Sequence, residues 1–191
     1  MSKRGIGALD IIPGDTAASK AQNYAKKIAR IIEDTFPTQF VARRLSDADD
    51  DTQHGPLPGK RDLSTFFSKN PKISFTTTCI PSLLAFNPSA FDGVKDVKVL
   101  KANLTSMRRV YRAAPQYTQM HALVSSGIKP CMQITQMGLT GFTVRYGARV
   151  GGAREAAKIY GRASQAHALS YHLLANFGNA VSLAPIGRWP D

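Results

Sequence analysis

Apolar residues recur at helical spacing along much of the chain, and the first such segment is the most regular. It predicts a helix over about residues 16–34, with Thr16 as its N-cap. The apolar face of this helix is formed by Tyr24, Ile28, Ile31 and Ile32. Phe36-Pro37 then ends the helix, because a residue before proline disfavours helical backbone, and a short helix is expected over 38–45.

Shorter elements are predicted through the middle of the chain. Asp62 is expected to cap a short helix, and the β-branched run 73–80 predicts a strand or an extended stretch. Thr105 is expected to cap another helix. Pro115 either lies in the first turn of the helix after that or kinks a single long one.

The last part of the chain is also predicted to be helical. One or two helical turns are expected over 131–137, and the longest helix follows Gly151-Gly152 and runs over about 153–177. Tyr160 and Tyr171 fall within the apolar periodicity of that helix, so both are expected in the core.

Together these patterns predict a mainly α fold, with a compact helical core domain and extended arms at both ends. The core is expected over 16–178 and includes an acidic, solvated loop at 46–60. Glycine and proline without periodicity predict a flexible N-terminal arm over 1–15, and residues 179–191 are expected to form a C-terminal tail.

Charge is distributed unevenly along the chain. Residues 97–189 hold 12 Lys or Arg and a single carboxylate, Glu155. With the terminal Asp191 included, residues 97–191 carry a formal charge of +10, whereas residues 1–96 carry +2. Like charges held so close together repel one another, and a polyanion is their usual partner. The charge pattern therefore indicates binding to the phosphate backbone of a nucleic acid.

Many of these cations fall into two groups along the sequence. One group occupies a single helical turn, and the other surrounds the glycine-rich start of the longest helix. Arginine makes bidentate contacts to phosphate and stacks on bases, which a neighbouring tyrosine can also do. The candidate RNA-binding residues are Arg108, Arg109, Arg112, Arg145, Tyr146, Arg149, Arg154 and Lys158. The alternative is a solvated surface stripe in which Glu155 pairs with Arg154 or Lys158.

Residues that would carry catalysis or hold a metal are sparse. The four histidines are scattered, and no catalytic, nucleotide-binding or zinc-binding motif is present. We therefore expect no enzymatic activity, no cofactor and no metal site. Cys79 and Cys131 are expected to be buried thiols in a reducing compartment rather than a disulfide. No apolar stretch approaches the roughly 20 residues that cross a bilayer, so no membrane partner is expected.

Three segments also carry a resemblance. They are Asn-Leu-Thr-Ser-Met-Arg-Arg-Val at 103–110, Phe-Thr-Val-Arg-Tyr at 142–146 and Ala-Arg-Glu-Ala-Ala at 153–157. In this order they resemble the T-x-R-Q helix start, the F-D-F motif and the A-R-E-A helix in coat proteins of flexible filamentous plant viruses of the potyvirus and potexvirus type. The resemblance covers about residues 103–170. It implies a helical core, arms that dock on neighbouring subunits, and a helical filament enclosing single-stranded RNA.

The resemblance also assigns one role and shows one departure. The family's conserved arginine, which lies in the RNA groove, corresponds to Arg108. Thr143 stands where the F-D-F motif has its aspartate, so the family's Arg–Asp pair cannot form in this chain.

The sequence thus predicts a viral coat or nucleocapsid protein, located in the virion and the host cytoplasm. Its expected partners are single-stranded RNA, held in an arginine-rich groove without sequence specificity, and further copies of itself, contacted through the terminal arms. The alternative is a ribosomal or other ribonucleoprotein subunit that binds one folded RNA and does not polymerise.

Overall fold

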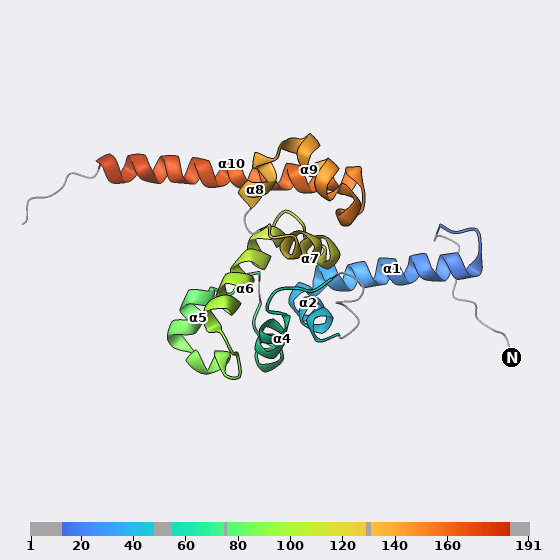
Figure 1. The fold of residues 1–191 in the computed structure, drawn as a ribbon, viewed down its shortest axis with the longest axis horizontal. Helices are drawn as coiled ribbons and strands as arrows, with labels where there is room; N and C mark the ends of the chain where they lie inside the picture. The colour runs from blue at the N-terminus through green and yellow to red at the C-terminus, as the bar shows by residue number, and fades with distance from the viewer. Residues whose placement is uncertain (1–12, 48–54, 75, 129–130, 184–191) are drawn as a thin grey trace, which may run out of the picture.

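The described chain is mainly helical (Figure 1). The computed structural model describes residues 13–47, 55–74, 76–128 and 131–183, and these ranges contain no β-strand. The predicted mainly α fold class is confirmed. The α-helices are α1 (Ala17–Thr35), α2 (Pro37–Ser46), α4 (Lys60–Lys69), α5 (Ile80–Phe86), α6 (Val97–Tyr111), α7 (Tyr117–Ser125), α8 (Cys131–Gln136), α9 (Gly138–Tyr146) and α10 (Ala153–Leu183). Two short 3-10 helices are η2 (Pro88–Phe91) and η3 (Gly147–Val150).

Helix α6 provides a central apolar face of the core. Leu100, Leu104, Met107 and Val110 follow one another at steps of three or four residues, and each is at most 2 % exposed. Burial of each such side chain contributes roughly 1.5–3 kcal/mol. The helix starts where it does because the carboxylate of Asp96 accepts the N–H of the third helical residue at 2.9 Å.

Two predicted N-caps are wrong, because both residues lie inside helices that begin earlier. Thr105 lies in the middle of α6, where its hydroxyl donates to the carbonyl of Lys101 at 2.7 Å. Asp62 lies in the first turn of α4, which starts after Gly59 in the left-handed region. The Asp62 carboxylate instead accepts the backbone N–H groups of residues 95 and 96, both at 3.2 Å. It therefore joins α4 to the start of α6.

Aromatic rings and one asparagine hold α4 against η2. The ring of Phe66 lies 5.4 Å, between centroids, from the rings of both Phe67 and Phe91. The side-chain amide of Asn70 donates to the carbonyl of Phe66 at 2.8 Å and to that of Ala90 at 2.7 Å. This asparagine satisfies a helix-end carbonyl while it fixes the position of the next element.

Helices α8, α9 and the first half of α10 form another part of the core. Ile134, Phe142 and Ile159 belong to the same cluster of buried residues as the α6 face. The chain enters α10 through Gly151 and Gly152, whose φ angles are +99° and +104°. Only glycine adopts this region readily, so the predicted helix start at this pair is confirmed.

Two long-range hydrogen bonds connect α10 and η3 to the α6–α7 region. The side-chain amide of Gln119 in α7 donates to the carbonyl of Val150 at 3.2 Å. The Nε of Arg162 in α10 donates to the carbonyl of Ala113, just after α6, at 2.6 Å. Arg162 is thus partly buried and holds the connection between α6 and α7 against α10.

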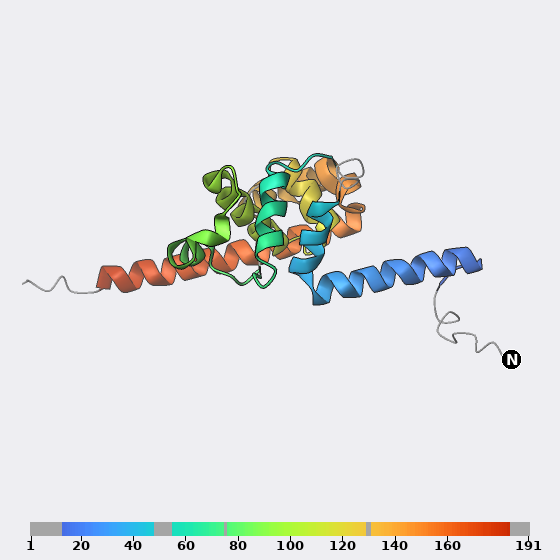
Figure 2. The same cartoon turned by 90° about the horizontal axis from the view of Figure 1, so that it is seen from below.

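Two long helices extend away from this core in opposite directions (Figures 1 and 2). They are α1 and the second half of α10. The predicted helix over 16–34 is confirmed, with Thr16 as N-cap in a capping box, but none of its residues is buried. The last part of α1 is tied to the core by Glu33, whose carboxylate accepts the backbone N–H of Tyr117 at the start of α7. The apolar face of α1 is therefore only about half covered, with Ile28 at 37 % and Ile31 at 51 % exposed.

Other predictions differ from the structure in physically clear ways. The strand alternative for 73–80 is not found among the described residues: residues 76 and 77 lie in a turn, in which the hydroxyls of Ser74 and Thr78 accept backbone N–H groups, and α5 begins at Ile80. Helix α10 continues beyond residue 177 to Leu183, since an internal glycine costs only about 1 kcal/mol and Pro185 is the next strong breaker. Tyr171 is 70 % exposed, so its predicted place in the core is wrong, whereas Tyr160 packs partly buried against the core.

Several predicted features fall wholly or partly outside the described residues. They are most of the N-terminal arm, most of the acidic loop and most of the C-terminal tail. Of the two cysteines, Cys79 is exposed, so its predicted burial is wrong. It precedes α5 in a turn-rich segment at the surface, where no apolar element covers it.

Candidate nucleic-acid interface

The last turn of α6 and the C-cap residue after it carry three of the predicted arginines on one face. Residues 105, 108, 109 and 112 recur at steps of three, one and three, which brings their side chains to the same side of a helix. Across from them lies the start of α5. Between the two helices is a cavity of about 260 Å³, lined by Ile80, Pro81, Thr105, Arg108, Arg109 and Arg112. We call this cavity the α5–α6 pocket.

Arg108 is fixed in this pocket by a contact to the segment before α5. Its Nη1 donates to the carbonyl of Thr78 at 3.0 Å. A guanidinium has five N–H donors, so this bond positions the group without using up its capacity. Arg108 also lies near the C-terminal end of α6, where the helix dipole favours a cation. The residue is therefore both a support for the loop and a candidate phosphate contact.

The exposed thiol of Cys79 borders the same pocket through its neighbour Ile80. The hydroxyl of Ser82 donates to its Sγ at 3.2 Å. Hydrogen bonds from Ser82, and to a lesser degree the charge of Arg108, lower the pKa of Cys79 from its ordinary value of 9.0. This thiol is consequently a chemical reporter for whatever occupies the α5–α6 pocket.

A second pocket gathers residues from the other predicted group. This α8–α9 pocket has a volume of about 310 Å³, and its polar lining includes Ser126, Gln133, Gln136 and Arg145. Arg149 joins its edge, because Nη1 donates to the hydroxyl of Ser126 at 2.8 Å. Amide, hydroxyl and guanidinium groups together can donate several hydrogen bonds to an anionic ligand.

Tyr146 lines the α8–α9 pocket but is itself buried. Its ring lies 5.5 Å from that of Phe142, and the guanidinium carbon of Arg145 lies 5.7 Å from its centroid. A ring that is packed in this way offers a base only the edge that lines the pocket, and the contact of Tyr146 to a base or sugar stays a prediction. The two rings meet because Phe142 and Tyr146 are four residues apart and so lie on one face of α9.

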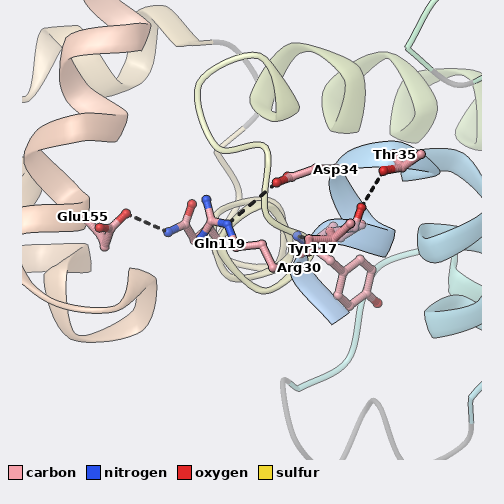
Figure 3. Close-up of polar contacts among 8 residues, drawn as sticks. Arg30, Asp34, Thr35, Tyr117, Gln119 and Glu155 are labelled. Carbon is pink, nitrogen blue, oxygen red and sulfur yellow. Dashed lines mark hydrogen bonds and ion pairs between the residues drawn. The ribbon is translucent and has the colours of Figure 1, made fainter. Parts of the chain in front are cut away.

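The predicted cations on α10 have mixed surroundings. Lys158 pairs with Glu155 at 2.7 Å, and this hydrogen bond is the main reason that the pKa of Glu155 is lowered. Glu155 also accepts a 3.5 Å hydrogen bond from Gln119 (Figure 3). Arg154, one residue before, is exposed at the start of the helix. Of the two pairings that the sequence left open for Glu155, the structure has the one with Lys158.

The predicted residues thus do not line one continuous cavity among the described residues. Three lie in the α5–α6 pocket, two line the α8–α9 pocket, and Arg149 borders the latter. Arg112 and Arg145 make no ion pair within the described part of the chain. Glu155 is the only carboxylate between residues 97 and 189, and it bonds to Lys158. The guanidinium groups of Arg112 and Arg145 therefore have no counter-charge from residues 97–189.

Sequence reasoning missed the residues that complete the first pocket. Ile80 and Pro81 come from a segment about 30 residues before the arginines and supply an apolar wall. Thr105 could have been found from its three-residue spacing to Arg108, had the helix been predicted to begin earlier. No group of three or more His, Cys, Asp or Glu that could hold a metal occurs among the described residues. None of the described helices combines the length and the hydropathy needed to traverse a bilayer.

Comparisons with known proteins add no relative to this description. No protein-family model matches the chain, and neither curated proteins nor solved structures show significant similarity to it. The resemblance to coat proteins of flexible filamentous plant viruses therefore stays a prediction that depends on the three short sequence segments.

Proposed function

We propose that this protein is a viral coat or nucleocapsid subunit, which packages single-stranded RNA through its phosphate backbone and assembles with copies of itself. One observation carries the proposal. Arg108, Arg109 and Arg112 surround one pocket whose opposite wall is apolar. Guanidinium groups suit phosphate oxygens, and the wall formed by Ile80 and Pro81 suits the face of a sugar or base.

The α8–α9 pocket supports a second contact to the same polymer. It offers Arg145 and the amides of Gln133 and Gln136, and it contains no carboxylate in its lining. Neither pocket holds a ring of donors and acceptors matched to one base. Contacts of this type bind the backbone without reading sequence, which is what a packaging protein requires.

The surplus charge explains why a polymer of phosphates is the favoured ligand. Residues 97–191 carry +10, and RNA would neutralise this charge while releasing counterions. Localisation in the virion and in the host cytoplasm belongs to the same proposal. The absence of an enzymatic role, a cofactor and a membrane partner remains the expectation from sequence.

The test compares two charge-matched double variants in binding to a single-stranded uridine oligonucleotide. Arg109→Gln with Arg112→Gln removes two cations from the α5–α6 pocket, whereas Lys26→Gln with Lys27→Gln removes two cations from α1. We measure the dissociation constant across a series of salt concentrations. Each lost phosphate contact lowers the slope of log K against log salt by about 0.7, so the arginine pair should lower it by about 1.4.

The control pair should change the slope by much less, because α1 projects from the core on the side of α2 (Figure 2). Equal slopes for the two double variants would remove the pocket from the RNA site. Negative-stain images with long RNA then separate the packaging proposal from the ribonucleoprotein alternative. Filaments or rings support packaging, whereas single particles that bind only one folded RNA contradict it.

A further inference from the structure

We infer that the apolar face of α1 in one copy packs along residues 164–183 of α10 in a second copy. We call this second half of the helix distal α10. The inference builds on the self-assembly in the proposed function and names the two surfaces that meet. It differs from docking through the chain ends, because both surfaces are helices within the described residues.

The face of α1 has the composition of an interface, but none of its residues is buried by the described part of the chain. Tyr24, Ile28 and Ile31 recur at steps of four and three residues, and Ile32 lies beside them. Ile31 is 51 % exposed and Ile32 is 47 % exposed. Apolar residues at steps of three and four form a stripe on one side of a helix, and such a stripe is typical of a helix that packs against another element.

Distal α10 is unusual in a different way. Residues 164–183 contain no Lys, Arg, Asp or Glu, although the whole chain carries a formal charge of +12. Leu169 is 62 % exposed, Tyr171 is 70 % exposed and Leu173 is 50 % exposed. A solvent-exposed helix normally carries charged residues on its outer face. An uncharged helix that extends from the core is therefore expected to be covered by another protein surface.

The two helices match in length and cannot meet within one chain. α1 has 19 residues, and distal α10, at 20 residues, is of nearly the same length. At 1.5 Å per residue, each is about 30 Å long. Figures 1 and 2 show them leaving opposite ends of the core. Pairing must therefore join two copies. Where two copies do not exchange both contacts in a closed dimer, the contact repeats along a filament or closes into a ring.

Charge selects this pairing over the pairing of two α1 helices. Lys20 and Lys27 flank the apolar face of α1 along one edge, while the carboxylates of the helix lie at its end. Two such helices side by side would bring like charges together at a cost. Distal α10 has no charge to oppose these lysines. Pairing of two distal α10 helices avoids repulsion too, but leaves the isoleucines of α1 in water.

The size of the contact predicts a weak individual pair. A stable interface buries about 800 Å² on each partner, with about 20–30 residues a side. Two helices in contact over about 30 Å use only one face of each, so they provide less than this. Each internal copy of an assembly makes the contact twice, and a shared RNA would add to it. Association without RNA should therefore depend on protein concentration.

Cysteine cross-linking in the full chain tests which helices meet. In a background with Cys79→Ser and Cys131→Ser, one preparation carries Ala25→Cys in α1 and another carries Ser170→Cys in α10. Both positions are exposed; Ala25 borders the apolar face of α1, and Ser170 lies between Leu169 and Tyr171 in distal α10. Each preparation alone and an equal mixture are treated with a short bismaleimide, without RNA. Covalent dimers should form in the mixture and be nearly absent from each preparation alone.

The inference would be overturned if either preparation alone gave the same yield of covalent dimers as the mixture. It would also be overturned if the mixture gave no dimers at any attainable concentration. A second comparison guards against misfolding. Ile31→Glu places a carboxylate in the face, whereas Gln22→Glu makes the same charge change on the far side of α1. The first should weaken association by about tenfold or more, since burial of an unpaired charge is costly, and the second should not.

These measurements contain no RNA, so they fail or succeed independently of the RNA-binding test. Heterotypic dimers with unchanged salt slopes would keep the pairing and remove the packaging role. A lowered salt slope for the arginine pair without heterotypic dimers would keep the RNA site and remove the pairing.

Discussion

Glu33 joins the last turn of α1 to the start of α7. Its carboxylate reaches from α1 to accept the N–H of Tyr117, the first residue of α7. That N–H has no partner within its own helix, so Glu33 acts as a cap supplied from another element. Replacement of Glu33 by alanine should reduce the free energy of unfolding by about 1 kcal/mol, the usual value for loss of a capping oxygen.

Replacement of Glu33 by glutamine provides the matched control. The side-chain carbonyl of glutamine can still accept the N–H, and the buried charge is gone. Burial is the largest cause of the raised pKa of Glu33, whose ordinary value is 4.5. A carboxyl with a raised pKa stabilises the folded state most when it is protonated, and this contribution is lost as pH rises through the raised value. As the pH rises through the raised pKa of Glu33, the Glu33→Gln variant should therefore become more stable relative to the wild type.

Urea unfolding, followed by circular dichroism at several pH values from about 4 to 8, measures both effects. At neutral pH, Glu33→Ala should be the least stable of the three proteins and Glu33→Gln at least as stable as the wild type. The reasoning is refuted if alanine and glutamine behave alike, or if the glutamine variant keeps the pH dependence of the wild type.

Three further predictions follow from packing, reactivity and one long-range bond. Leu104→Ala should cost about 2–5 kcal/mol in urea unfolding because it opens a cavity in the core, whereas Val99→Ala on the exposed side of α6 should cost far less. Alkylation of Cys79 should slow when single-stranded RNA binds, and equal rates with and without RNA would contradict occupancy of the adjoining pocket. Arg162→Ala should cost about 1.5–3 kcal/mol because a buried carbonyl loses its charged donor, whereas Arg154→Ala at the exposed start of α10 should lie within about 0.5 kcal/mol of the wild type.

Local signals in the sequence were enough to locate most helices. The apolar period of α1, the cap at Thr16 and the glycine pair before α10 each act over a few residues, and the structure has all three. Positions at which two local signals compete were predicted less well. Thr105 has a capping side chain but lies within a longer apolar repeat that begins at Leu100, and the repeat prevails.

Burial depends on contacts that no local pattern contains. The stripe of isoleucines on α1 looks the same whether it packs within the chain or against another copy, so its exposure was not predictable. Tyr146 is buried because Phe142 lies one turn away and the chain folds over both. A tyrosine between arginine and glycine in the sequence gives no sign of this.

The candidate site was predictable only where its residues are close together in the sequence. Arg108, Arg109 and Arg112 meet because helical spacing alone puts them on one face. The apolar wall of their pocket comes from α5, and Arg108 bonds to Thr78, 30 residues earlier. The second pocket depends on how α8 and α9 pack, which no spacing in the sequence indicates.

Mapping the path of bound RNA tests the central claim most directly. The full-length protein is photo-cross-linked to a single-stranded oligonucleotide that contains 4-thiouridine, and the attached peptides are identified by mass spectrometry. Cross-links are expected in residues 78–82 and 105–112, at the α5–α6 pocket, and in residues 126–146, at the α8–α9 pocket. Cross-links confined to α1 and distal α10, with none at either pocket, would contradict the account.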